Sequence, residues 1–92
     1  MLEEIKAHLK ITWNDEDINI NGFIARGKIY LDDLMGSTLI YDEDGQPKSL
    51  LFDYCRYAYN NALEYFEENF SKEILRLQLK IGISLMPVEV VE

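Results

Sequence analysis

The stretch "FDYCRYAYNNALEYFEENF", residues 52–70, holds most of the aromatic side chains of the chain and contains no glycine or proline. Its apolar side chains recur at the three- and four-residue spacing of one helix face. We therefore predict a helix over residues 47–69, with Pro47 in the first turn, where a missing N–H costs nothing. The predicted buried face consists of Leu51, Tyr54, Ala58, Ala62, Tyr65 and Phe66.

The tyrosines of this stretch occupy several faces of the predicted helix, more than the core of one small domain can bury. Tyrosine is enriched at protein interfaces because its ring is apolar and its hydroxyl is polar. A base-stacking platform would need a basic groove beside the rings, and this helix is acidic. The pattern favours a helix that serves both the core and a subunit interface, through Tyr54, Tyr57, Tyr59 and Tyr65.

Two further helices are predicted upstream. Residues 2–10 have apolar side chains at helical spacing, and a second helix runs to Met35 and ends at Gly36, with Thr12 or Asn14 as its N-cap. Inside it, Gly22 and Gly27 cost about 1 kcal/mol each relative to alanine, so we expect another helix to approach closely there. The apolar stripe comprises Ile20, Ile24, Gly27, Leu31 and Leu34, broadened by Ile18, Ala25, Ile29 and Tyr30.

The remaining segments are a loop and a C-terminal region. Residues 36–46, with Asp44-Gly45, favour a loop over a β-hairpin because the following "QPKS" is a poor return strand. Residues 71–81 fit either a helix that begins at Ser71 or a strand, and residues 83–92 are predicted to form an extended apolar arm. The fold class that follows is all-α, a small bundle of three to four helices with an extended C-terminal arm, in one domain over residues 1–92.

Composition narrows the possible functions. The chain has 17 acidic against 9 basic residues, a net charge of −8, and its basic residues are scattered singly. Direct nucleic-acid binding is therefore disfavoured. No apolar run approaches the roughly 20 residues that span a bilayer, and the acidic N-terminus is unlike a signal peptide. The single cysteine cannot form an internal disulfide, which indicates a reducing, cytoplasmic setting for the folded chain.

The chain offers little chemistry. His8 is its only histidine, so His-based metal pairs and Ser-His-Asp arrangements are disfavoured, and we interpret it as a surface or half-buried residue. Cys55 lies in the middle of an apolar helix and is interpreted as core. The "DEDG" at residues 42–45 lacks the ligand spacing of a calcium loop. We predict no enzymatic activity, no metal site and no cofactor.

The order of these signals resembles the small head-tail connector, or adaptor, proteins of tailed phages and prophages, also described as phage DNA-packaging proteins. The similarity covers nearly the whole chain: "MLEEIKAHLKITWNDEDINI", a long helix, an acidic loop with a proline, "LLFDYCRYAYNNALEYFEENF" and "EILRLQLKIGIS". The "RLQLK" at residues 76–80 matches the Gln-Leu core of a C-terminal motif found in part of the family, although Lys80-Ile81 replace its shorter charged ending.

The resemblance implies a structural virion protein without catalytic residues, made in the cytoplasm of the bacterial host and located at the head-tail junction. It implies self-association into a ring of about a dozen subunits. The ring would lie beneath the portal protein, contact the next tail-side connector protein and extend the DNA channel. No sequence-specific nucleic-acid binding and no membrane contact are implied.

Within this picture, an acidic channel wall would repel DNA phosphates. Asp42, Glu43 and Asp44 are the candidates for that wall, with a purely solvated loop as the alternative. The subunit interface is predicted to include the four tyrosines and the arm residues Ile83, Leu85, Met86, Val88 and Val90. The alternative function is a monomeric acidic protein-binding module or DNA mimic that occupies a basic groove on its partner.

Overall fold

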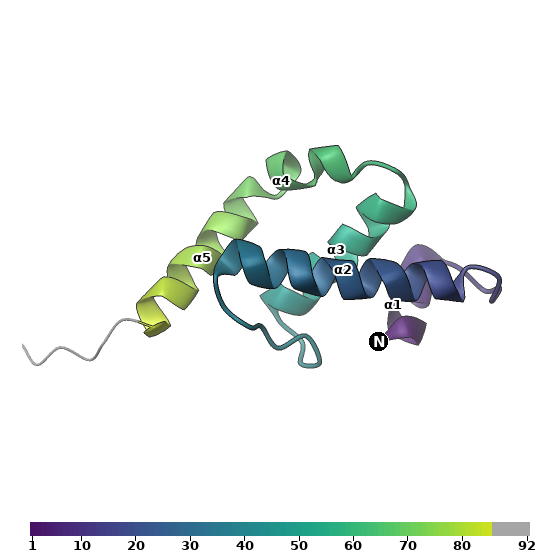
Figure 1. The fold of residues 1–92 in the computed structure, drawn as a ribbon, viewed down its shortest axis with the longest axis horizontal. Coiled ribbons are helices and arrows are strands. Elements are labelled where there is room, and N and C mark those ends of the chain that lie inside the picture. Colours follow the sequence, from purple (N-terminus) through teal and green to yellow (C-terminus); the bar gives the residue numbers. More distant parts are fainter. Residues whose placement is uncertain (86–92) are drawn as a thin grey trace, which may run out of the picture.

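Helices α2 (Asp17–Met35) and α3 (Gln46–Tyr59) pack against each other and form the centre of the fold in the computed structural model, which describes residues 1–85 (Figure 1). The other elements are α1 (Leu2–Leu9), the 3₁₀ turn η1 (Leu63–Tyr65), the short α4 (Phe66–Asn69) and α5 (Ser71–Leu85). Residues 1–85 contain no strand. The predicted all-α fold is confirmed, the loop before α3 is confirmed, and the strand alternative for residues 71–81 is wrong.

Helix α1 ends where Lys10 adopts a left-handed conformation with φ of 62°, and the Ile11 N–H donates to the Lys6 carbonyl at 2.8 Å. The helix predicted over residues 2–10 is thereby confirmed to within one residue. Its inner face buries Ile5, which is fully inaccessible to solvent, together with the side chain of Lys6. A buried lysine needs a partner for its charge, and the chain supplies it from the start of α2.

The start of α2 lies later than predicted, at Asp17 rather than just after Thr12 or Asn14. The Asn14 side chain does not cap the helix. Its Oδ1 instead accepts a hydrogen bond from the Lys6 ammonium at 2.7 Å, and Asp17 Oδ1 lies 2.8 Å from the same Nζ. The buried Lys6 ammonium of α1 thus binds the Asn14 oxygen that could otherwise cap α2. Its contact with Asp17 joins α1 to α2.

The inner stripe of α2 is buried as predicted at Ile20, Ile24, Gly27 and Leu31, and Met35 is buried as well. The predicted broadening of the stripe is wrong at Ile18 and Ile29, which are 86% and 70% exposed. The physical reason is that the neighbouring helices cover one side of α2 and leave the other to solvent. The helix ends as expected at Gly36, whose φ of 67° favours glycine.

Gly27 is the point of closest approach between α2 and α3. A Cβ atom on Gly27 would lie 2.7 Å from Leu51 Cδ1 and 2.8 Å from Tyr54 Cδ1. The predicted compensation for this glycine is therefore confirmed. Gly22 differs, because a Cβ there would meet only the Arg26 side chain of the same helix, at 3.2 Å.

The helix predicted over residues 47–69 is interrupted. Pro47 lies in the first turn as expected, but α3 ends at Tyr59, and Asn61 adopts a left-handed conformation with φ of 56°. The Ala62 N–H then donates to the Tyr57 carbonyl at 2.8 Å. Asparagine tolerates this conformation better than most residues. The turn reverses the chain and brings Phe66 back onto the core, where it is 1% exposed.

Helix α5 packs one face on the α2 side of the core through Ile74 and Leu77, and Gln78 Nε2 donates to the Leu34 carbonyl at 3.1 Å. The helix begins at Ser71 as expected, and it continues beyond residue 81, through Gly82, to Leu85. Residues 83–85 of the predicted extended arm are therefore helical, because the 3.6-residue apolar periodicity runs on past Gly82. Residues 86–92 lie outside the described residues.

Replacing Gly27 with alanine places a methyl group against Leu51 and Tyr54, two side chains that are themselves buried. We expect the free energy of unfolding to fall by about 1–3 kcal/mol, the usual cost of overpacking, despite the gain in helix propensity. Urea unfolding followed by circular dichroism measures this change. Gly22→Ala is the matched control and should stabilise the fold by up to about 1 kcal/mol. Equal effects at the two glycines would contradict the proposed close packing.

Asp17→Asn removes the negative charge beside the buried Lys6 ammonium. We expect a loss of about 1–2 kcal/mol in the free energy of unfolding, because the carboxylate is partly exposed and solvent screens part of the interaction. Thermal unfolding at neutral pH measures the loss. Asp15→Asn makes the same chemical change at an exposed position without an ion pair among residues 1–85, and it should stay within about 0.5 kcal/mol of the unmodified chain.

Candidate functional site

The two side chains with most potential for catalysis, His8 and Cys55, both pack against other residues of the fold. Residues 1–85 hold no group of three or more His, Cys, Asp or Glu side chains placed to bind a metal ion. His8 is exposed on α1, with its ring 5.6 Å from the ring of Phe52. Cys55 is fully buried in α3, and this burial raises the pKa of its thiol to about 12.

Within the described part of the chain, no helix combines the length and the apolar character needed to cross a lipid bilayer.

Phe66 is the centre of an aromatic cluster that explains why residues 52–70 are so rich in rings. Its ring centroid lies between 5.1 and 6.1 Å from those of Tyr30, Tyr54, Tyr57 and Phe70. The Tyr57 and Tyr54 rings stand edge-on to it, which is a favoured geometry. Most of the aromatic surface of this stretch therefore packs within the chain.

The hydroxyl of Tyr30 adds a polar contact to this cluster by donating to the Glu67 carboxylate of α4. Burial, together with this hydrogen bond, raises the pKa of Tyr30, so the phenol stays protonated at neutral pH. The bond joins α2 to α4, the segment that follows the turn after α3.

The four tyrosines predicted at a subunit interface are not brought together on one surface. Tyr54 is 7% exposed in the core, Tyr57 is half-buried in the aromatic cluster, and Tyr59 is half-buried with its hydroxyl donating to Glu16 at 2.9 Å. Tyr65, in η1, is 55% exposed. Among them, Tyr65 has the most surface available for a partner.

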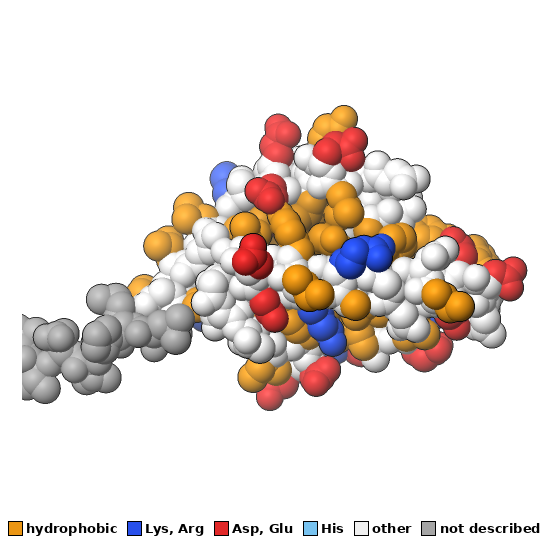
Figure 2. Space-filling model, in the orientation of Figure 1, with side chains coloured by type: hydrophobic (Ala, Val, Ile, Leu, Met, Phe, Trp, Pro, Cys, Tyr) orange, Lys and Arg blue, Asp and Glu red, His pale blue; other side chains and the backbone are white. Residues whose placement is uncertain are grey.

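The outer face of α5 is an uncovered apolar stripe with a basic border. Its apolar members Leu75, Leu79 and Ile83 recur every four residues and are 55%, 59% and 70% exposed. In Figure 2, hydrophobic side chains lie along α5 at the left of the view. We define the outer face of α5 as the lining of an open hollow of about 570 Å³, together with the start of α3: Lys72, Leu75, Arg76, Leu79, Lys80 and Ile83, next to Gln46.

The cations of this face are not balanced by nearby carboxylates, since Lys72, Arg76 and Lys80 make no ion pair with the described residues. Of the predicted arm residues, Ile83 belongs to this face and Leu85 is the last residue of α5. Met86, Val88 and Val90 lie outside the described residues.

The end of the molecule opposite to the tip of α5 is formed by the turn between α1 and α2 (Figure 1). There, Trp13 is 46% exposed and Ile18 is 86% exposed, next to the exposed Asp15. Glu16 accepts hydrogen bonds from the Trp13 indole at 2.7 Å and from Tyr59, and neither neutral donor cancels its charge. We call these four residues, Trp13, Asp15, Glu16 and Ile18, the 13–18 edge.

The predicted channel-facing residues Asp42, Glu43 and Asp44 are all exposed on the loop between α2 and α3. The loop is anchored at its base. Tyr41 is buried, its hydroxyl donates to Asp32 Oδ1 at 2.7 Å, and the Leu39 N–H donates to the same oxygen at 3.1 Å. Burial and the hydrogen bond to Asp32 raise the pKa of Tyr41.

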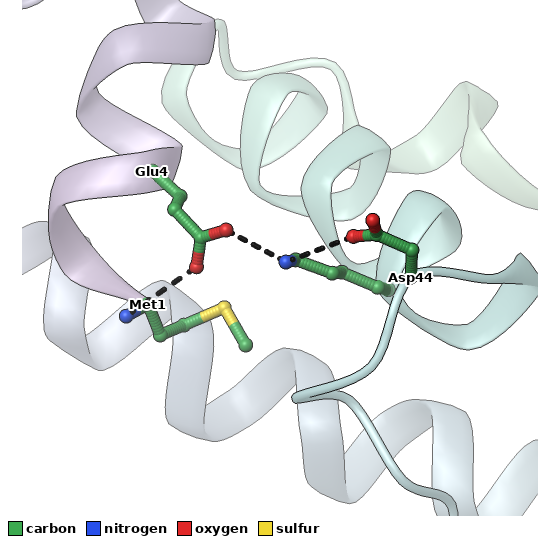
Figure 3. A network of polar contacts seen from close by, with 4 residues as sticks. Met1, Glu4 and Asp44 are labelled. Carbon is green, nitrogen blue, oxygen red and sulfur yellow. Dashed lines mark hydrogen bonds and ion pairs between the residues drawn. The ribbon is translucent and has the colours of Figure 1, made fainter.

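Asp44 differs from its two neighbours because a cation holds it (Figure 3). Lys48 Nζ, from the first turn of α3, lies 3.3 Å from Asp44 Oδ1 and 2.6 Å from Glu4 Oε2 of α1. The hydrogen bond from Lys48 lowers the pKa of Glu4, and Glu4 raises the pKa of Lys48. The Met1 amino group lies 3.7 Å from Glu4 Oε1. Asp42 and Glu43 make no ion pair within residues 1–85.

Sequence reasoning missed both the outer face of α5 and the 13–18 edge. The signal for the first was present, because Leu75, Leu79 and Ile83 stand four residues apart, but residues 71–81 also fit a strand, and of these three only Ile83 was predicted at an interface. The 13–18 edge crosses the turn into α2, and periodicity placed Ile18 in the apolar stripe of that helix, whereas it is 86% exposed. Only the folded chain shows that Trp13 and Ile18 are exposed together.

The protein-family model described as phage gp6-like head-tail connector protein matches residues 1–86. No curated protein and no solved structure gives a significant match. The family model spans every helix of the structure, including α5 with its exposed outer face. The resemblance read from the sequence is thereby confirmed, and this chain belongs to the phage gp6-like head-tail connector family.

Proposed function

We propose that this chain is a connector subunit that assembles as a ring beneath the phage portal and extends the channel through which DNA passes. Membership of the connector family indicates a structural role at the head-tail junction of the virion and contact with other phage head and tail proteins. The observation that carries the finer proposal is the outer face of α5. An apolar helix face that stays open in the single chain is the kind of surface that a subunit buries on assembly.

The ring is proposed to hold about a dozen copies, as expected from the family, each presenting two different complementary surfaces. The interface takes its apolar area from the outer face of α5, from Tyr65 and from the C-terminal residues Met86, Val88 and Val90. Tyr54 and Tyr57 contribute indirectly, by fixing the position of α4 through the aromatic cluster. The subunit carries out no catalysis in this proposal, and it needs no metal or cofactor.

The loop between α2 and α3 is proposed to face the channel. Asp42 and Glu43 supply unbalanced negative charge, while the anchoring of Tyr41 to Asp32 limits how far the loop can move. Negative side chains lining a narrow passage repel DNA phosphates and prevent the wall from holding the DNA. Asp44 is proposed to position the loop through Lys48 and to contribute less to this repulsion.

Light scattering coupled to size exclusion tests assembly across a wide concentration range, first with the chain alone and then with purified portal from the phage or prophage that encodes it. We expect a large oligomer of defined mass, formed either by the chain alone or on the portal. A monomer that is indifferent to the portal would contradict the proposal. It would favour the acidic binding module instead, for which a basic partner would then be sought.

Reversing the charge of the loop tests its place in the channel. The double variant Asp42→Lys, Glu43→Lys should make the assembled connector retain linear double-stranded DNA at low salt, because cations now face the phosphates. An electrophoretic shift measures retention, and it should disappear as salt is raised. The matched control, Glu64→Lys with Glu68→Lys, makes the same charge change near α4. Equal DNA retention by both variants would place the loop outside the channel.

A further inference from the structure

The outer face of α5 lacks a partner within the described chain, although much of it is apolar. Its stripe of Leu75, Leu79 and Ile83 is more than half exposed at every position. A contiguous exposed apolar patch on a small protein often marks a surface that contacts another protein. Only the opposite face of α5 is covered, by the core around Ile74 and Leu77. The outer face is therefore a candidate docking surface for another molecule.

Charge identifies the chemistry of that occupant. The outer face exposes three cations that are not ion-paired within residues 1–85, in a chain whose net charge is −8. A complementary surface combines exposed apolar side chains with unbalanced carboxylates. The 13–18 edge has both, since Trp13 and Ile18 are exposed beside Asp15 and Glu16. Asp17 is excluded from this set because Lys6 balances its charge.

The two surfaces are placed so that they cannot pair with each other within one molecule. The tip of α5 and the 13–18 edge lie at opposite ends of the molecule (Figure 1), and Figure 2 shows acidic and hydrophobic side chains together at the end away from α5. A pairing between these surfaces must therefore join two molecules. It is head-to-tail, so every copy offers one free surface of each kind, and the assembly forms a ring where the rotation between successive copies closes.

We infer that the outer face of α5 docks on the 13–18 edge of a second copy of this chain, with the Leu75-Leu79-Ile83 stripe against Trp13 and Ile18 and the bordering cations against Asp15 and Glu16. This inference rests on the proposed ring and specifies which surfaces form it. A nucleic acid fits the outer face less well, because its centre is apolar and it carries only three cations.

Cross-linking through engineered cysteines tests the pairing directly. Cys55 is buried and its thiol has a raised pKa, so we expect it not to form disulfides in this reaction. The variant Ile18→Cys, Leu79→Cys, treated with a mild oxidant in the full chain, should give a ladder of disulfide-linked dimers, trimers and larger species. An equal mixture of the two single variants should stop at the mixed dimer, because each chain then has only one reactive surface.

The matched control is Glu64→Cys with Leu79→Cys, which keeps the α5 cysteine and moves the other to an exposed site near α4. It should give at least five-fold less ladder. Arg76→Glu, added to the cross-linking pair, should lower the yield by a similar factor, whereas Arg26→Glu, an equal charge change on α2, should leave the yield unchanged. Yields that do not differ between the pair and its control would overturn the inference.

The same reactions are run with portal present. In one outcome, the unmodified chain assembles to a defined mass while the variant gives no cross-link between residues 18 and 79. That result overturns this docking but leaves the connector function supported. Cross-links from the α5 cysteine to portal instead of to the second copy overturn the docking in the same way. Failure of the unmodified chain to assemble, alone or on portal, instead removes the proposed function itself.

Discussion

The close contact of α2 with α3 at Gly27 is the constraint on which the other elements depend. Leu51 and Tyr54 occupy the space that a side chain at residue 27 would need, so the two long helices approach more closely than side-chain layers normally allow. Phe66 packs on the Tyr54 and Tyr30 rings of this pair, and α5 follows from Phe66 and Phe70. On the other side, Lys6 fixes α1 to the start of α2. The direction in which α5 projects is thus a consequence of how α2 and α3 meet.

Helical periodicity in the sequence was sufficient to predict the fold class and most of the core. Ile20, Ile24, Leu31, Leu51 and Ala58 are buried as their spacing indicated. The errors came from interactions that periodicity does not encode. Asn14 was expected to cap a helix, but a buried lysine from another helix takes its side chain. The helix over 47–69 breaks because the Asn60-Asn61 turn allows Phe66 to reach the core, a gain that arises only in three dimensions.

The candidate surfaces were less accessible to sequence reasoning than the core. The number of tyrosines predicted more rings than one small core can bury, but it could not show that Phe66 gathers Tyr54 and Tyr57 inward and leaves Tyr65 exposed. The acidic loop was found because three consecutive carboxylates are visible in any sequence. The division among them, with Asp44 held by Lys48 and the other two not ion-paired within the described residues, depends on α1 and α3 meeting beside the loop.

The charge distribution has a consequence for the timing of assembly. Two copies of a chain with a net charge of −8 repel each other, and at physiological ionic strength this repulsion, like the proposed attraction between the outer face of α5 and a carboxylate edge, is screened beyond about 8 Å. The net repulsion therefore opposes association of free subunits most strongly at low ionic strength, where the screening length is greater. A docking platform that holds several copies side by side removes this barrier. The order of events during virion construction would then be set by the subunit's own electrostatics, without a separate regulator.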